Sequence, residues 1–164
     1  MKVASRLLGP IDISEDERIR FPGGLLGFEG LEDFALVALE EYAPFLWLLS
    51  EDDADVAFAL GDPEPFLSEP YPLVLDDADA AVLDLEPGDR VQVLLFVQTT
   101  DEPCRVTANL KAPVVVNLRS RRAKQLILYG SRLSSRQPAR ALAGTGRNVR
   151  AHEITVQIPR EEAA

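Results

Sequence analysis

The chain has 164 residues, of which 46% are hydrophobic and 27% are charged, and its formal net charge at pH 7 is −10. A chain of this length and composition predicts one domain, over residues 1–164, with a sizeable core, and excludes disorder along the whole chain. No apolar run approaches the roughly 20 residues that span a bilayer, and the apolar stretch near the N-terminus is too short for a signal peptide. The only cysteine, Cys104, excludes an intrachain disulfide and a cysteine-based metal site. We therefore expect a cytoplasmic protein.

The negative charge is distributed unevenly along the chain. Residues 1–104 hold 24 acidic and 5 basic side chains, a balance of −19, whereas residues 105–164 hold 3 acidic and 12 basic ones, a balance of +9. Two interpretations stay open at this point. Either the two halves neutralise each other in the fold, or an acidic face meets a basic partner.

Short apolar segments rich in β-forming residues and separated by turn residues dominate the chain. The predicted strands, in chain order, are Lys2–Leu8, Ile11–Ile13, Arg18–Phe21, Phe34–Leu39, Phe45–Ser50, Val56–Leu60, Val91–Gln98, Arg105–Asn109, Val114–Leu118, Gln125–Tyr129 and Glu153–Ile158. This pattern predicts an all-β, mostly antiparallel fold, a small barrel-like sheet that limits exposed edges.

One or two short helices are predicted beside the strands. Asp77–Leu85 fits a helix with Asp76 or Asp77 as N-cap and with Ala81, Leu83 and Leu85 partly buried. Gln137–Ala143 fits another turn or two of helix. Residues 131–148 are rich in Arg and Ser and contain Gly144-Thr145-Gly146, so we expect a mobile loop or tail segment there.

The residue types needed for catalysis are scarce. His152 is the only histidine, and it precedes Glu153 in a predicted strand, where neighbouring side chains point to opposite faces. The acidic cluster at residues 51–55 lacks the spacing, central glycine and closing glutamate of a calcium-binding loop. We expect no enzyme activity, no cofactor and no metal site.

The basic segment Arg119–Lys124 supports an alternative function. Arg119, Arg121, Arg122 and Lys124 could grip an RNA backbone. No aromatic residue is interleaved among them to stack bases, and the acidic balance of the chain opposes non-specific attraction. A solvated or internally paired basic edge is the favoured interpretation, and an RNA-binding domain is the alternative.

Two segments resemble a known family. The first runs from Ile19 to Phe34, and its turn is built from Pro22, Gly23, Gly24, Gly27 and Phe28. We interpret this turn as a structural element. Replacing Gly24 or Gly27 by Val would lower the free energy of unfolding by roughly 1–3 kcal/mol if φ is positive there. The second runs from Thr107 to Asn117. Together with Pro44–Ser50, Asp62-Pro63 and the segment around Asn117 and Gln125, they resemble the flagellar assembly factor FliW over about residues 3–130.

The resemblance implies a small β-barrel-like protein that regulates bacterial motility. FliW proteins bind flagellin and the RNA-binding translational repressor CsrA, and they relieve the repression of flagellin translation. An acidic face is suited to meet the basic surface of an RNA-binding protein. We therefore expect CsrA and flagellin as protein partners, no direct nucleic-acid binding, no membrane and a monomer. The predicted partner-binding residues are Glu51, Asp52, Asp53, Asp55, Asn109 and Lys111.

Overall fold

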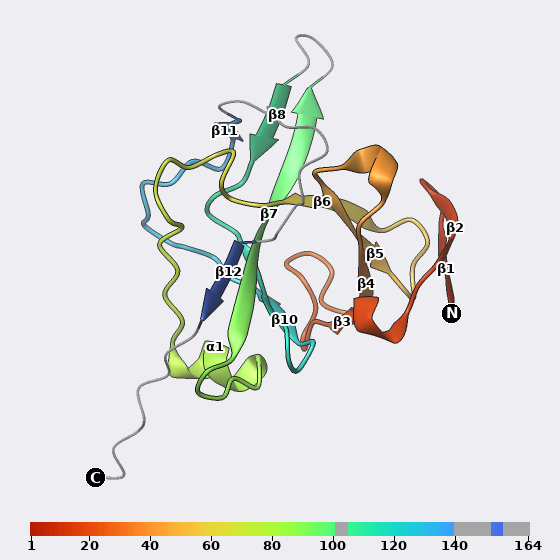
Figure 1. Cartoon of the computed structure of the whole chain (residues 1–164), viewed down its shortest axis with the longest axis horizontal. Helices are drawn as coiled ribbons and strands as arrows, with labels where there is room; N and C mark the ends of the chain where they lie inside the picture. Colours follow the sequence, from red (N-terminus) through yellow and green to blue (C-terminus); the bar gives the residue numbers. More distant parts are fainter. Residues whose placement is uncertain (101–104, 140–151, 156–164) are drawn as a thin grey trace.

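The computed structural model describes residues 1–100, 105–139 and 152–155, and these form a mostly antiparallel β fold (Figure 1). The strands are β1 (Lys2–Ser5), β2 (Gly9–Asp12), β3 (Arg18–Arg20), β4 (Asp33–Val37), β5 (Leu46–Ser50), β6 (Ala57–Gly61), β7 (Arg90–Thr100), β8 (Arg105–Ala108), β9 (Val114–Asn117), β10 (Ala123–Gln125), β11 (Gln137–Pro138) and β12 (His152–Thr155). One α-helix, α1 (Asp77–Val82), and 3-10 turns at Glu15–Glu17 and Glu40–Tyr42 complete the described elements. The predicted fold class is confirmed.

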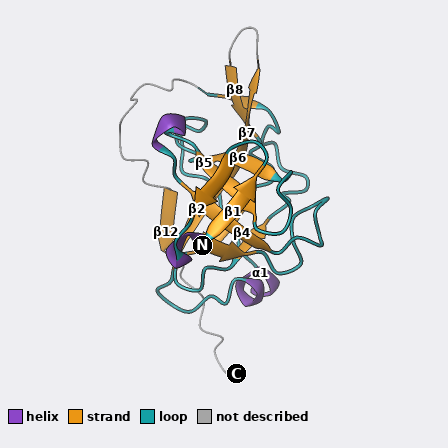
Figure 2. Ribbon diagram, turned by 90° about the vertical axis from the view of Figure 1, so that its right-hand side faces the viewer, coloured by secondary structure: helices purple, strands orange, loops and turns teal. Residues whose placement is uncertain are grey.

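Strand β7 organises the main sheet. One of its edges pairs with β12 and then with β6, and the other pairs with β9 and then with β8, all antiparallel. The sheet continues from β6 through β5 and β4 to β3, and from β9 to β10. Beyond the body of the sheet, β7 and β8 project together as an arm, which both ribbon views show (Figures 1 and 2).

The sheet curls until its two ends meet. Arg20 of β3 forms an isolated parallel bridge with Arg122, in which the Arg20 N–H donates to the carbonyl of Arg121 at 3.0 Å. This contact is a single bridge and not a ladder, so the sheet is barrel-like without being a closed barrel. The inside of the curl holds Phe21 and Phe34, whose rings meet edge to face with centroids 5.2 Å apart.

Both faces of the sheet are covered. Along β7, Leu94 joins the core inside the curl, while Val93 and Leu95 face the long connection that follows β6 and contact Phe66 and Tyr71. In β5, Leu48 and Leu49 are both fully buried because they belong to cores on opposite faces. The apolar run at residues 45–49 is thus covered on both faces of the sheet at these two positions.

The helix predictions have mixed outcomes. Helix α1 begins after Asp76, whose carboxylate accepts a 2.7 Å hydrogen bond from the Asp79 N–H, and this confirms the N-cap. Leu83 is buried, but Ala81 is exposed, contrary to expectation. The helix predicted at Gln137–Ala143 is wrong for Gln137–Ala139, because β11 pairs with β8 and the Ala139 N–H donates to the Val106 carbonyl.

Some strand ends differ from the predictions. The strand predicted at Gln125–Tyr129 is observed at Ala123–Gln125. Residues 131–139 of the predicted mobile segment pack on the body of the domain through Leu133. Residues 140–148 lie outside the described part of the chain, so the mobility of this segment stays a prediction.

None of the helices in the described ranges is long and apolar enough to cross a membrane.

Candidate protein-binding surfaces

The glycine turn between β3 and β4 closes on its own backbone. The Gly24 N–H donates to the Phe21 carbonyl at 2.8 Å, and the Phe28 N–H donates to the Leu25 carbonyl at 2.7 Å. Gly24 has φ +77°, and a Cβ there would lie 2.4 Å from the Phe28 carbonyl oxygen. Gly27 also has a positive φ, of +86°, but open space surrounds its missing Cβ. These distances support a structural role for Gly24 above all.

Phe28 differs from the other aromatic residues of this segment. Phe21 and Phe34 are fully buried, whereas 38% of Phe28 is exposed. The Phe28 ring meets Phe58 edge to face at 5.3 Å, and Phe58 meets Phe96 of β7 in the same way at 5.4 Å. The turn is therefore anchored to the central strand by an aromatic chain, with one end at the surface.

The acidic turn, residues 51–55, follows β5 and is held by local hydrogen bonds. The N–H groups of Asp52 and Asp53 both donate to the Ser50 hydroxyl, and the Asp55 N–H donates to the Asp53 carboxylate. Glu51 has only 7% of its side chain exposed and accepts two hydrogen bonds from the guanidinium of Arg18, at 3.0 and 3.1 Å. Glu51 is therefore a structural counter-charge.

The other carboxylates of the acidic turn face solvent to different degrees. Asp55 pairs with Arg6 at 2.7 Å, and both of these side chains are well exposed. No ion pair among the described residues involves Asp52 or Asp53. Asp52 is exposed and Asp53 is partly exposed, and no described cation neutralises the charge of either carboxylate.

Asn109 and Lys111, the other predicted partner-binding residues, form the turn between β8 and β9. The Asn109 side-chain oxygen accepts a 2.9 Å hydrogen bond from the Lys111 N–H, so the asparagine shapes the turn, as expected of this residue type. The Lys111 side chain is exposed. This turn lies between β8 and β9 and the acidic turn between β5 and β6, so the predicted residues fall on two different turns.

A second acidic segment, residues 76–89, neutralises the basic segment Arg119–Lys124. The Arg119 guanidinium contacts the Asp89 carboxylate at 2.9 Å and Glu86 at 3.6 Å, and it also donates to the Asp84 carbonyl. The hydrogen bond from Arg119 holds the pKa of the Asp89 carboxyl below its ordinary value, against the opposing effect of burial. This geometry supports mutual neutralisation of the two chain halves.

Asn117 connects the same two segments and is fully buried. Its amide nitrogen donates to the carbonyls of Leu83 and Asp84 at 2.9 and 3.3 Å and to the Asp89 carboxylate at 3.1 Å. Its oxygen accepts a 3.1 Å hydrogen bond from the Arg119 N–H. Asn117 therefore satisfies the carbonyl groups at the end of α1 and orients the carboxylate that holds Arg119.

The remaining basic residues of the segment are held to different extents. Lys124 donates to the Asp79 carboxylate. Burial of Asp79 raises its pKa, but Lys124 and the hydrogen bond from the Asp76 N–H together outweigh burial and lower the pKa. Arg121 is half-buried, which lowers its pKa, and its guanidinium donates to the Arg18 carbonyl at 3.4 Å. Arg122 is exposed. A segment so largely occupied within the molecule is poorly suited to follow an RNA backbone.

The residue patterns around Asp89 and Asn117 do not predict this network. The opposite charges of the two segments were a signal that they pair, but not of which residues do so. Within the described ranges, no group of three or more His, Cys, Asp or Glu side chains could hold a metal ion. His152 and Cys104 have no described side-chain environment.

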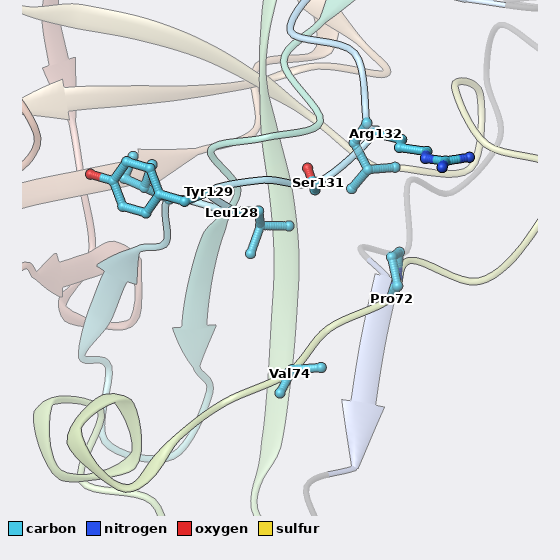
Figure 3. Close-up of a pocket in the computed structure, with 8 residues that line it drawn as sticks. Pro72, Val74, Leu128, Tyr129, Ser131 and Arg132 are labelled. Carbon is cyan, nitrogen blue, oxygen red and sulfur yellow. The ribbon is translucent and has the colours of Figure 1, made fainter.

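An open groove lies between the extended segment before α1 and the segment after β10 (Figure 3). Its volume is about 720 Å³, and Pro72 and Val74 face Leu128, Ser131 and Arg132 across it. A second hollow of about 410 Å³ continues along β10 towards Asp76 and Asp79 and shares Val74 and Leu128 with the first. The two hollows together form one extended concave surface along the segment after β10.

The fold and these surfaces define a small, mostly antiparallel β domain with charged and apolar surfaces suited to binding proteins. The model of the FliW protein family matches residues 2–139. The chain belongs to the FliW family of flagellar assembly factors.

Individual relatives agree with this assignment. The chain is 36% identical to the flagellar assembly factor FliW of Syntrophus aciditrophicus over 83% of this chain and 85% of that protein. It is 37% identical to the FliW of Bacillus licheniformis over 84% and 96% of the respective chains. A crystal structure of the flagellar assembly factor FliW superimposes with a TM-score of 0.73 at 30% identity, over 84% of this chain and 96% of the other.

Proposed function

We propose that this protein is a cytoplasmic regulator of flagellar assembly that binds flagellin and antagonises the translational repressor CsrA by direct protein–protein binding. Membership of the FliW family is the observation that carries the proposal, because it places the chain among flagellar assembly factors. Binding, and not catalysis, is the proposed mode of action. Both partners come from the sequence resemblance.

The charge arrangement supports an acidic surface for CsrA. Much of the positive charge is paired internally, by Arg18 with Glu51, by Arg119 with Asp89 and by Lys124 with Asp79, and this leaves Asp52 and Asp53 available. An RNA-binding repressor needs basic surface, and complementary charge steers such a partner to the acidic turn. The same pairing is the reason to prefer this function over RNA binding through Arg119–Lys124.

Regulation requires that the two partners influence each other. A domain of this size has little surface to spare, since a standard interface takes roughly 800 Å² of each partner. We expect saturating flagellin to lower the affinity for CsrA, and CsrA to lower the affinity for flagellin by the same factor, because binding linkage is reciprocal.

Calorimetric titration tests the proposal. CsrA is titrated into the protein with and without excess flagellin, and the reverse experiment is done with flagellin as titrant. We expect about a 5-fold or larger loss of affinity in both directions, within the usual range of coupling energies. Equal affinities with and without the second partner would overturn the switch, and absence of binding to both would overturn the proposed function itself.

A further inference from the structure

The backbone along the groove has unpaired hydrogen-bonding groups. β10 lies at the end of the strand order in the main sheet, so one of its edges has no neighbouring strand over most of its length. The pairing register of β9 and β10 continues beyond Gln125, since the N–H groups of Leu126 and Leu128 donate to the carbonyls of Pro113 and Lys111. Every second residue therefore points its N–H and C=O groups away from β9.

Ile127 and Tyr129 are the residues with outward-pointing groups at the groove. No hydrogen bond within the described part of the chain uses the N–H or C=O of either residue. At the start of the same edge, the Arg121 carbonyl is taken by Arg20 of β3, and the Gln125 side chain accepts a hydrogen bond from the Leu26 N–H. The glycine turn thus covers the first part of the edge and leaves the part at Ile127 and Tyr129 open.

The opposite wall of the groove is also unpaired and apolar. Val74 on this wall is 77% exposed, and Tyr129 on the β10 side is 88% exposed, both unusual for such side chains. The backbone groups of Val74 make no hydrogen bond among the described residues. On the floor, the buried Ser131 hydroxyl has no hydrogen-bond partner in the described ranges. An extended chain laid in the groove would find backbone partners and an apolar surface.

The charges at the two ends of the groove differ. Near α1, Asp76 and Asp77 are exposed, and the neighbouring Asp79 is neutralised by Lys124, so this end is acidic. At the far end Arg132 is exposed and makes no ion pair with a described residue. An antiparallel strand added to β10 would begin at the Arg132 end, so its N-terminal side should carry an acid and its C-terminal side a base.

We propose that this groove binds an extended segment of a partner protein, which adds a strand to the open edge at Ile127 and Tyr129. Between its charged ends the segment has about five residues, which span roughly 17 Å at the usual rise of a strand. Its alternating apolar side chains contact Val74, and its ends carry an acid and then a base. The inference goes beyond the proposed function, since it requires neither CsrA nor flagellin as the source of the segment.

A synthetic strand tests the groove directly. The probe is acetyl-Glu-Val-Thr-Val-Thr-Val-Lys-amide, added to the whole protein labelled with ¹⁵N, and the readout is amide hydrogen exchange by NMR. We expect the Ile127 and Tyr129 amides to gain about 10-fold or more protection at saturation, since they acquire backbone acceptors. The peptide with its Glu and Lys exchanged should bind about 2–5-fold more weakly, as mismatched exposed charges imply.

Matched variants separate the groove from other apolar surfaces. Ile127→Pro removes the edge N–H without touching the Leu128 hydrogen bond to Lys111, and Val74→Asp places a charge on the opposite wall. Both should abolish the protection, while Leu7→Asp, at a 66% exposed position in the β1–β2 turn, should leave it unchanged. If Ile127→Pro does not fold, Val74→Asp still tests the groove, because it changes an exposed side chain and no backbone hydrogen bond.

Three outcomes would overturn the proposal. The first is unchanged exchange at Ile127 and Tyr129 with the peptide bound or in excess. The second is equal binding of a peptide N-methylated at the residues that face β10. The third is protection that rises with protein concentration alone, which would make a second copy the occupant. Binding of CsrA and flagellin to the same variants is measured in separate titrations. Absence of binding to both would contradict the proposed function without contradicting strand binding in the groove.

Discussion

The two acidic segments of this chain look alike in sequence and differ in the folded protein. Residues 76–89 surround the basic segment Arg119–Lys124, and Asp89, with 8% of its side chain exposed, holds both Arg119 and Asn117. In residues 51–55, Glu51 is similarly committed to Arg18, but Asp52 and Asp53 pair with no described cation. Acidic density therefore does not reveal a binding surface; the position of the cations across the fold decides which carboxylates remain available.

The largest loss of stability is expected from a substitution in the glycine turn, outside both acidic segments. It gives a reference against which the effects of substitutions in the acidic segments can be compared. Gly24→Ala should lower the free energy of unfolding by more than about 3 kcal/mol, because strain at positive φ adds to overlap with the Phe28 carbonyl. Gly27→Ala, with open space around its Cβ, should cost about 1–2 kcal/mol. Denaturant melts of both variants decide it. Equal losses would remove the special role of Gly24, and a variant that melts normally but loses partner binding would make the turn an interface.

The structural role of residues 76–89 is tested at Asn117. Asn117→Ala should cost on the order of 2–4 kcal/mol of unfolding free energy, because the carbonyls of Leu83 and Asp84 and the Asp89 carboxylate lose a buried donor together. Asn109→Ala is the matched control at the other end of β9, and it should cost about 1 kcal/mol, since it removes one exposed turn hydrogen bond. Chemical denaturation measures both. Similar losses in the two variants would mean that the buried network contributes no special stability.

Acid should unfold the protein partly through residues 76–89. The folded-state pKa values of Asp79 and Asp89 lie below the ordinary value of 3.8, so their contribution is fully present above that value and is lost as the pH falls through the lower folded pKa. Asp89→Asn should be less stable than the parent at pH 7, and the difference should shrink as the pH falls from about 5 to 3. Melting temperatures across this range test it. A difference that stays constant with pH would show that Asp89 contributes through shape and not through charge.

The acidic turn should affect association and not folding. Asp52→Lys with Asp53→Lys should change the free energy of unfolding by less than about 1 kcal/mol, since no ion pair is broken and only the exposed hydrogen bond from the Asp55 N–H to Asp53 is lost. The same variant should lower the association rate with CsrA by about 3–10-fold at low salt and flatten its salt dependence. Glu41→Lys with Glu69→Lys, at exposed positions elsewhere, changes the net charge equally and serves as control. Stopped-flow kinetics with equal rates for the two double variants would place the CsrA surface elsewhere.

Local structure was largely predictable because it depends on neighbours in the chain. The strands around β3 to β7, the Asp76 N-cap and the glycine turn all follow from residue types within a few positions. The predicted helix at Gln137–Ala143 failed in its described part because pairing with β8 outweighed local preference. The candidate site was predicted as a set of acidic residues together with Asn109 and Lys111, without distinguishing Glu51 from Asp52.

By itself, the sequence determined the fold class, the family and the opposite charges of the two chain halves. Only the tertiary structure decided that Arg119 meets Asp89, 30 residues away, that Lys124 meets Asp79 at a separation of 45, and that Arg18 takes Glu51 at a separation of 33. It also decided that the glycine turn covers β10 as far as Gln125 and leaves Ile127 open. These pairings depend on how the sheet curls and which segments that curl brings together, and such long-range contacts leave no local pattern for the sequence to reveal.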